Sequence, residues 1–295
     1  MKILGIYRGA KFSPNHTAND EAIFRLAARN LEVLGAQISF ISETEFLESS
    51  PTPRFVFTMA REKEVVSRLK MLAEDGVRVT NSGTGIGNCY RAQMTQILVA
   101  NRVPHPGSVI MPTRGKHLQK TLETIASDGC WIKRGDFHAL HKEDVVYVPD
   151  VIQAVEMLEE FARRDIAEVV VNQHLKGDLV KFYGVRGTDF FYWFYPYDHH
   201  HVKYPETRQP APGMVHSTFA IDDLRKEANR AAALLDVDIY GGDAIVAPDG
   251  NFHLIDFNDW PSFAPCRSEA APFIAKRIME RCLAKEGATV ANALF

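Results

Sequence analysis

The stretch YGGDAIVAPDGNFHLIDFNDWPSF, residues 240–263, carries the clearest structural signal in this chain of 295 residues. Its Asp249-Gly250 pair is typical of a two-residue hairpin loop, because glycine tolerates the positive φ that a type I′ turn requires. The flanking segments, DAIVAP and NFHLIDFN, are short and rich in β-forming residues. They predict two paired strands, and a two-residue loop places Asp243 directly across from Asp256.

In this register the two carboxylates share one face of the hairpin, with Cβ atoms about 5 Å apart. Side chains alternate along a strand, so Asn258 also falls on that face. The apolar residues expected around this oxygen-rich group are Ile245, Ala247, Phe252 and Leu254. Facing carboxylates in such surroundings repel each other, and one takes up a proton unless a cation lies between them. Oxygen ligands of this kind suit Mg²⁺, which is usually also bound by water and substrate phosphates.

Two other arrangements of the hairpin stay open at this point. Exposed strands would leave both acids solvated, with no cation to share. A slip of one residue, or a β-bulge, would move the acids away from each other. The metal interpretation therefore depends on the register of the two strands.

Composition limits the classes of protein to which the chain can belong. Its length exceeds one ordinary domain, and 46% hydrophobic with 24% charged residues is normal for a globular protein. The net charge of −3 gives no reason to expect a nucleic-acid or membrane partner, and no apolar run approaches the roughly 18 residues of a membrane span. The N-terminus resembles a strand rather than a signal peptide. We expect a cytoplasmic protein with reduced cysteines, of which Cys266 is a candidate nucleophile.

The first third of the chain alternates between strand and helix patterns, which predicts a parallel, doubly wound α/β unit. Ligands favour the carboxyl ends of such strands, so the polar residues after the first strand, Arg8, Lys11 and His16, are candidates for a substrate rim or an ordinary solvated loop. Prolines at 104, 106 and 112 indicate a boundary. We expect domains at 1–112 and 113–295.

From about residue 115 onward, antiparallel hairpins replace the single alternation of helix and strand, which indicates an α+β architecture. We divide this part into subdomains 113–177 and 178–295. The glycine cluster NSGTGIGN (81–88) fails as a dinucleotide fingerprint, because it lacks the last glycine and the acidic residue that should follow about 20 residues later. Its helix start could still receive an anion.

Three segments in order resemble the ATP-grasp superfamily: WIKRG (131–135), VVVNQHLKGDLVKFYGV (169–185) and GGDAIVAPDGNFHLIDFN (241–258). The resemblance covers essentially the whole chain and is nearest to the D-alanine–D-alanine ligases and the ribosomal-protein glutamate ligases, with some likeness to the inositol trisphosphate kinases. It implies an α/β N-terminal domain plus an α+β ATP-grasp domain of two subdomains that enclose ATP between antiparallel sheets.

The resemblance also implies roles for individual residues. Lys133 matches the lysine that holds ATP phosphates, and Asp178 matches the acid that binds ribose. The remaining residues implied for ATP are Arg91, the hinge residues Gln173, His174 and Leu175 with Asn172 before them, Lys181, and Lys203 in the segment YDHHHVKY. The implied Mg²⁺ ligands are Asp243, Asp256 and Asn258. Arg267 stands where D-alanine ligases contact a substrate carboxylate, with a surface salt bridge as the alternative. The other substrate candidate is Arg8, from the polar residues after the first strand.

The chain departs from the family pattern at three places. The glycine-rich flap is replaced by GDFHALHKED (135–144), which makes His138 or Lys142 a candidate neighbour of the phosphates. Gly241 replaces a common arginine, so a developing oxyanion would need another partner, such as Arg208 or Arg225. Pro-Ser replaces the usual Pro-Gly after the metal ligands.

The activity that follows is an ATP- and Mg²⁺-dependent ligase that joins a carboxylate to an amine through an acyl phosphate and releases ADP. The alternative is a small-molecule kinase that transfers the γ-phosphate to a hydroxyl. A nucleotide-binding regulator without turnover is the third class. The expected partners are a small carboxylate and a small amine, and a homodimer is common in this superfamily.

Overall fold

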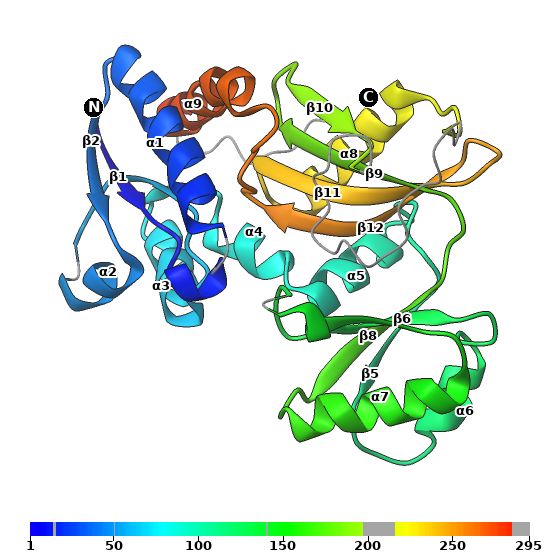
Figure 1. The fold of residues 1–295 in the computed structure, drawn as a ribbon. Helices are drawn as coiled ribbons and strands as arrows, with labels where there is room; N and C mark the ends of the chain where they lie inside the picture. The colour runs from blue at the N-terminus through cyan, green and yellow to red at the C-terminus, as the bar shows by residue number, and fades with distance from the viewer. Residues whose placement is uncertain (14–15, 50, 140, 197–215, 285–295) are drawn as a thin grey trace. The chain divides into compact units, whose positions relative to one another are not determined.

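The structure, a computed structural model, describes residues 1–13, 16–49, 51–139, 141–196 and 216–284 (Figure 1). It has two compact units, each described here by itself. The first contains Met1–Thr84, Val185–Phe190 and the chain from Ser262 onward, and the second contains Gly85–Gly184 and Phe191–Pro261. Among the described residues, no helix is long and apolar enough to cross a membrane.

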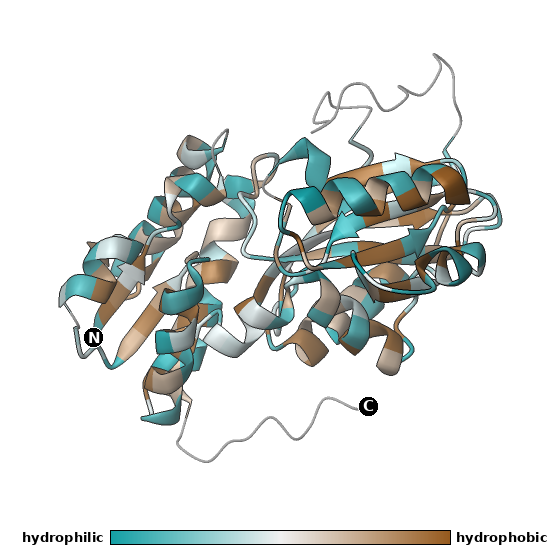
Figure 2. Ribbon diagram, turned by 90° about the horizontal axis from the view of Figure 1, so that it is seen from below, coloured by the Kyte–Doolittle hydropathy of each residue, from teal (hydrophilic) through white to brown (hydrophobic). Residues whose placement is uncertain are grey.

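The first unit contains a parallel sheet with strand order β2-β1-β3-β4, as the alternating pattern predicted. Its strands are β1 (Lys2–Ile6), β2 (Gln37–Ile41), β3 (Phe55–Thr58) and β4 (Arg78–Thr80). Its helices are η1 (Ala10–Phe12), α1 (Thr17–Val33), α2 (Glu43–Ser49), α3 (Lys63–Glu74) and α9 (Arg267–Leu283). Helix α1 packs on α9, and α2 packs on α3. In Figure 2 the strands of this sheet are largely brown, whereas the helices that cover it carry teal on their outer surfaces.

Helix α1 shows why these elements form. Its buried residues, Ile23, Phe24, Ala27, Ala28 and Leu31, recur at helical spacing and face the sheet. Gly35 ends the helix with a φ of 87°, a left-handed conformation that a side chain would strain. Helix α1 begins at Thr17, directly after His16, and α9 begins at Arg267, directly after Cys266.

The second unit contains two antiparallel sheets. The first has strand order β5-β8-β6-β7, with α6 and α7 against one face (Figure 1). Its elements are β5 (Ser108–Pro112), α6 (Leu118–Glu123), β6 (Cys130–Arg134), η2 (Lys142–Asp144), β7 (Val145–Val148), α7 (Val151–Arg163) and β8 (Glu168–Gln173). Ile132 and Val171 lie in the core under these helices. Because side chains alternate, Trp131 and Lys133 point from the opposite face.

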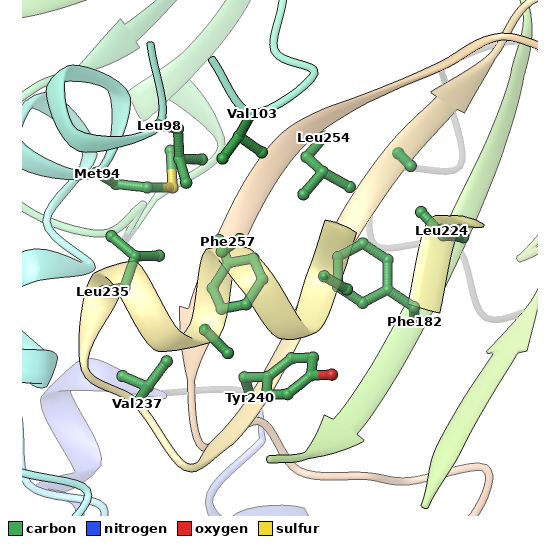
Figure 3. Close-up of a cluster of buried hydrophobic side chains, with 14 of the residues drawn as sticks. Met94, Leu98, Val103, Phe182, Leu224, Leu235, Val237, Tyr240, Leu254 and Phe257 are labelled. Carbon is green, nitrogen blue, oxygen red and sulfur yellow. The ribbon is translucent and has the colours of Figure 1, made fainter. Parts of the chain in front are cut away.

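The other sheet has strand order β10-β9-β11-β12. Its strands are β9 (Asp178–Val185), β10 (Phe191–Phe194), β11 (Ile239–Val246) and β12 (Phe252–Asp259), and the helices beside it are α5 (Arg91–Ala100) and α8 (Ile221–Leu235). Figure 3 shows Leu235 of α8 and Met94 of α5 meeting Phe182, Tyr240 and Phe257 of the strands in one buried cluster. This core fixes one face of the sheet and leaves the other face for the polar residues.

Most of the glycine cluster forms a short helix, α4 (Gly83–Asn88). A Cβ atom on Gly85 would lie 2.1 Å from the backbone oxygen of Asp236. The Asn88 side chain donates to the backbone oxygen of Leu235 at 3.2 Å. The glycine at position 85 is therefore explained by close packing against the end of α8, and a phosphate need not be invoked for it.

Candidate functional site

The β11–β12 hairpin pairs Asp243 with Asp256, as the sequence predicted, although the loop differs from the expected one. The loop has three residues, because Ala247 N–H donates to Asn251 at 2.8 Å and closes the strands one position earlier. Gly250 N–H then donates to Ala247, and Gly250 has a φ of 84°, as a left-handed loop position requires. The expected two-residue turn is wrong.

A β-bulge restores the register on which the site depends. Ala244 pairs with Leu254 while Asp243 pairs with Asp256, so Ile255 has no pairing residue. The bulge places Leu254 and Phe252 against the core below the sheet, which corrects the expectation that they surround the acids. Without the bulge, the three-residue loop would have separated the two carboxylates.

Each of the two carboxylates has its own cationic partner. Lys181 on β9 donates from Nζ to Asp243 Oδ1 at 2.7 Å. Arg91, at the start of α5, lies 3.4 Å from both carboxylate oxygens of Asp256. Both acid side chains are 26% exposed. The acids thus form neither a solvated surface pair nor a proton-sharing pair, because cations compensate them.

Lys133 provides a third positive charge beside the hairpin. It projects from β6, is buried, and donates from Nζ to the backbone oxygen of Ile255 at 2.9 Å. The bulge therefore supplies the carbonyl that holds this lysine. Burial lowers the pKa of Lys133 to about 8, and Arg91 adds repulsion that Asp256 and Asp243 partly offset.

The charge balance keeps Asp256 ionised. Burial opposes ionisation of this carboxyl, but the positive charges of Arg91, Lys133, His138 and Lys181 outweigh burial and lower its pKa to about 2. An ionised oxygen pair with an amide nearby is the donor chemistry that Mg²⁺ prefers. Asn258 fits this set, because it lies two residues after Asp256 and pairs with Gly241. No group of three or more His, Cys, Asp or Glu side chains suited to a metal occurs in the described part of the chain.

The glycine pair before Asp243 leaves no room for larger side chains. A Cβ atom on Gly241 would lie 2.7 Å from Pro261 Cγ and 2.8 Å from Tyr183 Cδ1. On Gly242 it would lie 2.5 Å from the backbone oxygen of Asp256. Packing therefore leaves no room for an arginine at position 241. Of the substitutes expected for it, Arg225 lies on α8, and Arg208 is outside the described residues.

The expected hinge begins at the last residue of β8, Gln173. Gln173 N–H donates to Gly107 at 2.8 Å and His174 N–H donates to Gly129 at 3.2 Å, so both backbone donors are engaged. The backbone of Leu175 makes no hydrogen bond to any described residue. Trp131 Nε1 donates to His174 Nδ1 at 3.2 Å, and burial lowers the pKa of His174, so the imidazole is neutral with its proton on Nε2. Leu175 is the hinge residue whose N–H a ligand can use.

Asp178 already has protein partners. Its Oδ2 accepts from the backbone N–H of Ser217 at 2.8 Å, and Oδ1 lies 3.7 Å from His216 Nδ1. His216 stacks on Tyr195 with ring centroids 3.6 Å apart. Asp178 therefore anchors the segment before α8, a role that no pattern in the sequence indicated. Lys203, the expected γ-phosphate contact, lies outside the described residues.

The segment expected as a flap is held down at its start. Ala92 N–H donates to Gly135 at 2.9 Å, and His138 Nε2 lies 3.1 Å from Asp259 Oδ1 in a buried pair. Phe137 is buried and lies 5.0 Å from the Tyr90 ring. His138 reaches the end of β12, one residue past Asn258. Sequence reasoning missed Asp259, since nothing in the sequence pairs residues 121 positions apart.

A second histidine near the site was also missed. His105 Nδ1 lies 2.6 Å from the backbone oxygen of Leu254, and Leu254 N–H donates to Pro104 at 2.8 Å. Burial lowers the pKa of His105 to about 4, and repulsion from Lys133 adds to this. A neutral imidazole that donates from Nδ1 therefore closes the edge of β12 beside the bulge.

The two substrate candidates lie in the first unit. Arg8 is enclosed, because its Nη1 bonds Asp20 at 2.9 Å and its Nε donates to Met59 at 3.1 Å. Arg267 donates to the Asn19 side chain at 2.9 Å and to the backbone oxygen of Ser262 at 3.3 Å.

The remaining candidates from the sequence are Lys11 and His16, at the expected substrate rim, and the thiol of Cys266. Lys11 forms an ion pair with Glu62, and His16 precedes α1. Cys266 is buried, and burial raises the pKa of its thiol to about 12, which does not suit a nucleophile.

No protein-family model and no curated protein sequence matches the chain. Solved structures match over nearly its whole length. A D-alanine–D-alanine ligase from Bacillus anthracis complexed with ATP has a TM-score of 0.67 at 15% identity and covers 96% of this chain and 97% of its own.

Two further solved structures have the same fold. D-cycloserine synthetase DcsG has a TM-score of 0.64 at 14% identity, with 95% of this chain and 99% of that chain covered. The ATP-grasp ligase PsnB, complexed with a minimal precursor, has a TM-score of 0.59 at 14% identity, with 94% and 98% covered. The structural neighbours are thus ATP-grasp ligases across the full length of the chain. The expected fold, a parallel α/β N-terminal sheet followed by two antiparallel sheets, is confirmed.

Proposed function

We propose that this chain is a ligase that uses ATP and Mg²⁺ to join a carboxylate to an amine through an acyl phosphate, with release of ADP. The observation that supports this most strongly is the facing, cation-compensated pair Asp243 and Asp256 beside Lys133. The chain shares its fold with ligases, one of which was solved with ATP. An oxygen-rich site facing clustered cations suits a triphosphate with its metal.

In this proposal the phosphates lie beside Lys133, Arg91 and Lys181, whose charges offset those of the transferring phosphoryl group. Asp243, Asp256 and Asn258 would hold Mg²⁺, which when bound neutralises charge on the phosphate oxygens. We assign the nucleotide to the second unit, between its two antiparallel sheets, β5-β8-β6-β7 and β10-β9-β11-β12.

Adenine would be read at the hinge, where Leu175 N–H is available as a donor. Gln173 and His174 would contribute their side chains and carbonyl groups, because their own N–H groups are engaged. Asp178 would contact ribose while its carboxylate still accepts the hydrogen bond from Ser217 N–H. Among the substrate candidates we keep Arg267 and assign Arg8 a structural role.

The reaction has two steps, a phosphoryl transfer to the carboxylate and an acyl transfer to the amine. A substrate carboxylate oxygen attacks the γ-phosphorus of ATP, the bond to the β–γ bridging oxygen breaks, and ADP leaves. The amine nitrogen of the second substrate then attacks the acyl carbon, inorganic phosphate leaves, and the nitrogen loses one proton. The two acids and the lysines of the site form no covalent bond in either reaction step, since they act by charge and position.

The test is to incubate the protein with Mg-ATP and pools of amino acids and small acids while measuring ADP. The proposal expects ADP release that requires two co-substrates, one of them an amine. Hydroxylamine in place of the amine should trap the activated acyl group as a hydroxamate. ADP release with a single hydroxyl compound, and no hydroxamate, would show phosphoryl transfer to a hydroxyl and contradict the proposal.

A further inference from the structure

The two acids proposed as metal ligands already have cationic side chains as partners. Lys181 lies 2.7 Å from Asp243, and Arg91 lies 3.4 Å from Asp256. Lys181 and Asp243 lie on β9 and β11, which are neighbours in the sheet, so this contact is made across a single strand spacing. Both pairs belong to the second compact unit.

The local charge balance opposes the entry of a bare divalent cation. The two carboxylates face three lysine and arginine side chains, because Lys133 also lies beside the hairpin and donates to the backbone oxygen of Ile255. His138 is paired with Asp259 and is not counted in this balance. Lys133 and Arg91 are buried, so bulk water screens them poorly. A dication that entered alone would add to this excess of positive charge and would have to displace Lys181 from Asp243.

A triphosphate changes this balance. Its oxygens can take over the lysine and arginine donors, which bind phosphate as readily as carboxylate. The released carboxylates would then face the metal that arrives with the nucleotide. The lysine and arginine side chains exchange carboxylate oxygens for phosphate oxygens, and no cation is left buried without an anion.

We propose that this site binds a divalent metal only together with nucleotide, because Lys181 and Arg91 occupy the two metal-binding carboxylates until phosphate oxygens replace those carboxylates. This counter-ion exchange rests on the proposed function, since it takes Asp243 and Asp256 as the metal ligands. It makes the metal–nucleotide complex the species that binds, and it keeps free divalent ions out of the empty site.

The experiment uses Mn²⁺ as the probe and follows its free EPR signal while the full-length, nucleotide-free protein is titrated. The wild type should leave Mn²⁺ free at submillimolar concentrations. A non-hydrolysable ATP analogue should then bring about one Mn²⁺ into a ternary complex with the protein. Lys181→Met should raise the nucleotide-free affinity for Mn²⁺ at least about tenfold, because it leaves Asp243 without its cation.

The matched control is Lys226→Met, which removes an exposed lysine from α8 and should not change Mn²⁺ affinity. Lys181→Gln, a polar replacement, repeats the test if the methionine variant does not fold. Tight binding of Mn²⁺ by the nucleotide-free wild type, or no gain in either Lys181 variant, would overturn the exchange while ligase activity could persist. Absence of Mn²⁺ from the protein even with the nucleotide analogue would instead overturn the proposed function.

Discussion

Charged residues gather in two parts of the molecule, at the carboxyl edge of the N-terminal parallel sheet and on the acid face of the β11–β12 hairpin. At the sheet edge, Arg8 and Asp20 are 4% and 8% exposed and bond each other directly. Glu43, also buried, accepts from the backbone N–H groups of Gly9 and Glu62 at 2.7 Å each. On the acid face, Asp243 and Asp256 are each 26% exposed, and Arg91 reaches Asp256 only at 3.4 Å.

This difference in exposure distinguishes charged pairs that stabilise the fold from charged pairs that can exchange partners. Both regions contain the same residue types, and both were candidates from sequence. Fully enclosed partners that satisfy each other have nothing left for a ligand, and removing one leaves the other as an uncompensated charge. Acids that are partly exposed, as Asp243 and Asp256 are, can change partners at lower cost. We therefore assign function to the hairpin and stability to the sheet edge.

The largest expected effect is that of Asp256→Asn, which should abolish turnover while the protein stays folded. Loss of a residue that only supports a metal ligand costs about 10–100-fold, so loss of a ligand should exceed a hundredfold. ADP release measures the effect, and circular dichroism with thermal unfolding checks the fold. Full activity in this variant would remove the distinction between the two regions.

The converse variant, Asp20→Asn, should act on stability alone. It leaves Arg8 buried without a counter-charge, so the free energy of unfolding should fall by about 3–5 kcal/mol. Nucleotide affinity of the folded protein should stay unchanged. Urea unfolding gives the first quantity and equilibrium binding the second. Glu21→Gln on the same helix is the control, because its exposed pair with Arg25 should be worth less than about 1 kcal/mol.

A third prediction concerns His105 and acid. Its pKa is about 4 in the folded protein and 6.5 in an unfolded chain, so between these values only the unfolded chain binds the proton. Stability should therefore fall as the pH drops from 6.5 to 4, by about 2–4 kcal/mol from this group. His105→Asn, which can keep a donor to Leu254, should lose this part of the pH dependence. An identical pH profile in variant and wild type would contradict the assignment.

The smallest effect is expected for Lys133→Ala, which should weaken ATP affinity severalfold to about tenfold, since one phosphate contact of about 1 kcal/mol or more is lost. Its folded pKa of about 8 adds a pH signature, because the cation is lost as the pH rises through 8. Wild-type affinity should fall between pH 7 and 9, and the variant should be flat. Lys176→Ala, an exposed lysine after the hinge, is the matched control. Equal nucleotide affinity in Lys133→Ala and wild type would remove Lys133 from the site.

Local signals in the sequence were enough for the element types and for the central pair. The alternating apolar residues of β11 and β12 and the glycine of the loop predicted the hairpin, and Asp243 does pair with Asp256. The prediction was right although two of its details were wrong. The longer loop shifted the register by one residue, and the bulge at Ile255 shifted it back. Neither has a local sequence signal.

Other features depend on residues far apart in the chain and could not be predicted from the sequence. Strand β5 lies in the proline-rich stretch read as a domain boundary, and it forms because β8 offers it an edge for pairing. The pair His138–Asp259 and the hydrogen bond from Ser217 N–H to Asp178 join residues far apart in the chain. Arg8 is a conspicuous cation in the sequence, and only the fold reveals that Asp20 encloses it.

The most direct test of the central claim is the affinity of the wild type and of the double variant Asp243→Asn/Asp256→Asn for a non-hydrolysable ATP analogue, measured by calorimetry with Mg²⁺ and again with EDTA. We expect wild-type binding that weakens at least about tenfold when the metal is removed, and a double variant whose binding no longer depends on the metal. Equal metal dependence in the two proteins, or no binding by the wild type, would contradict the account.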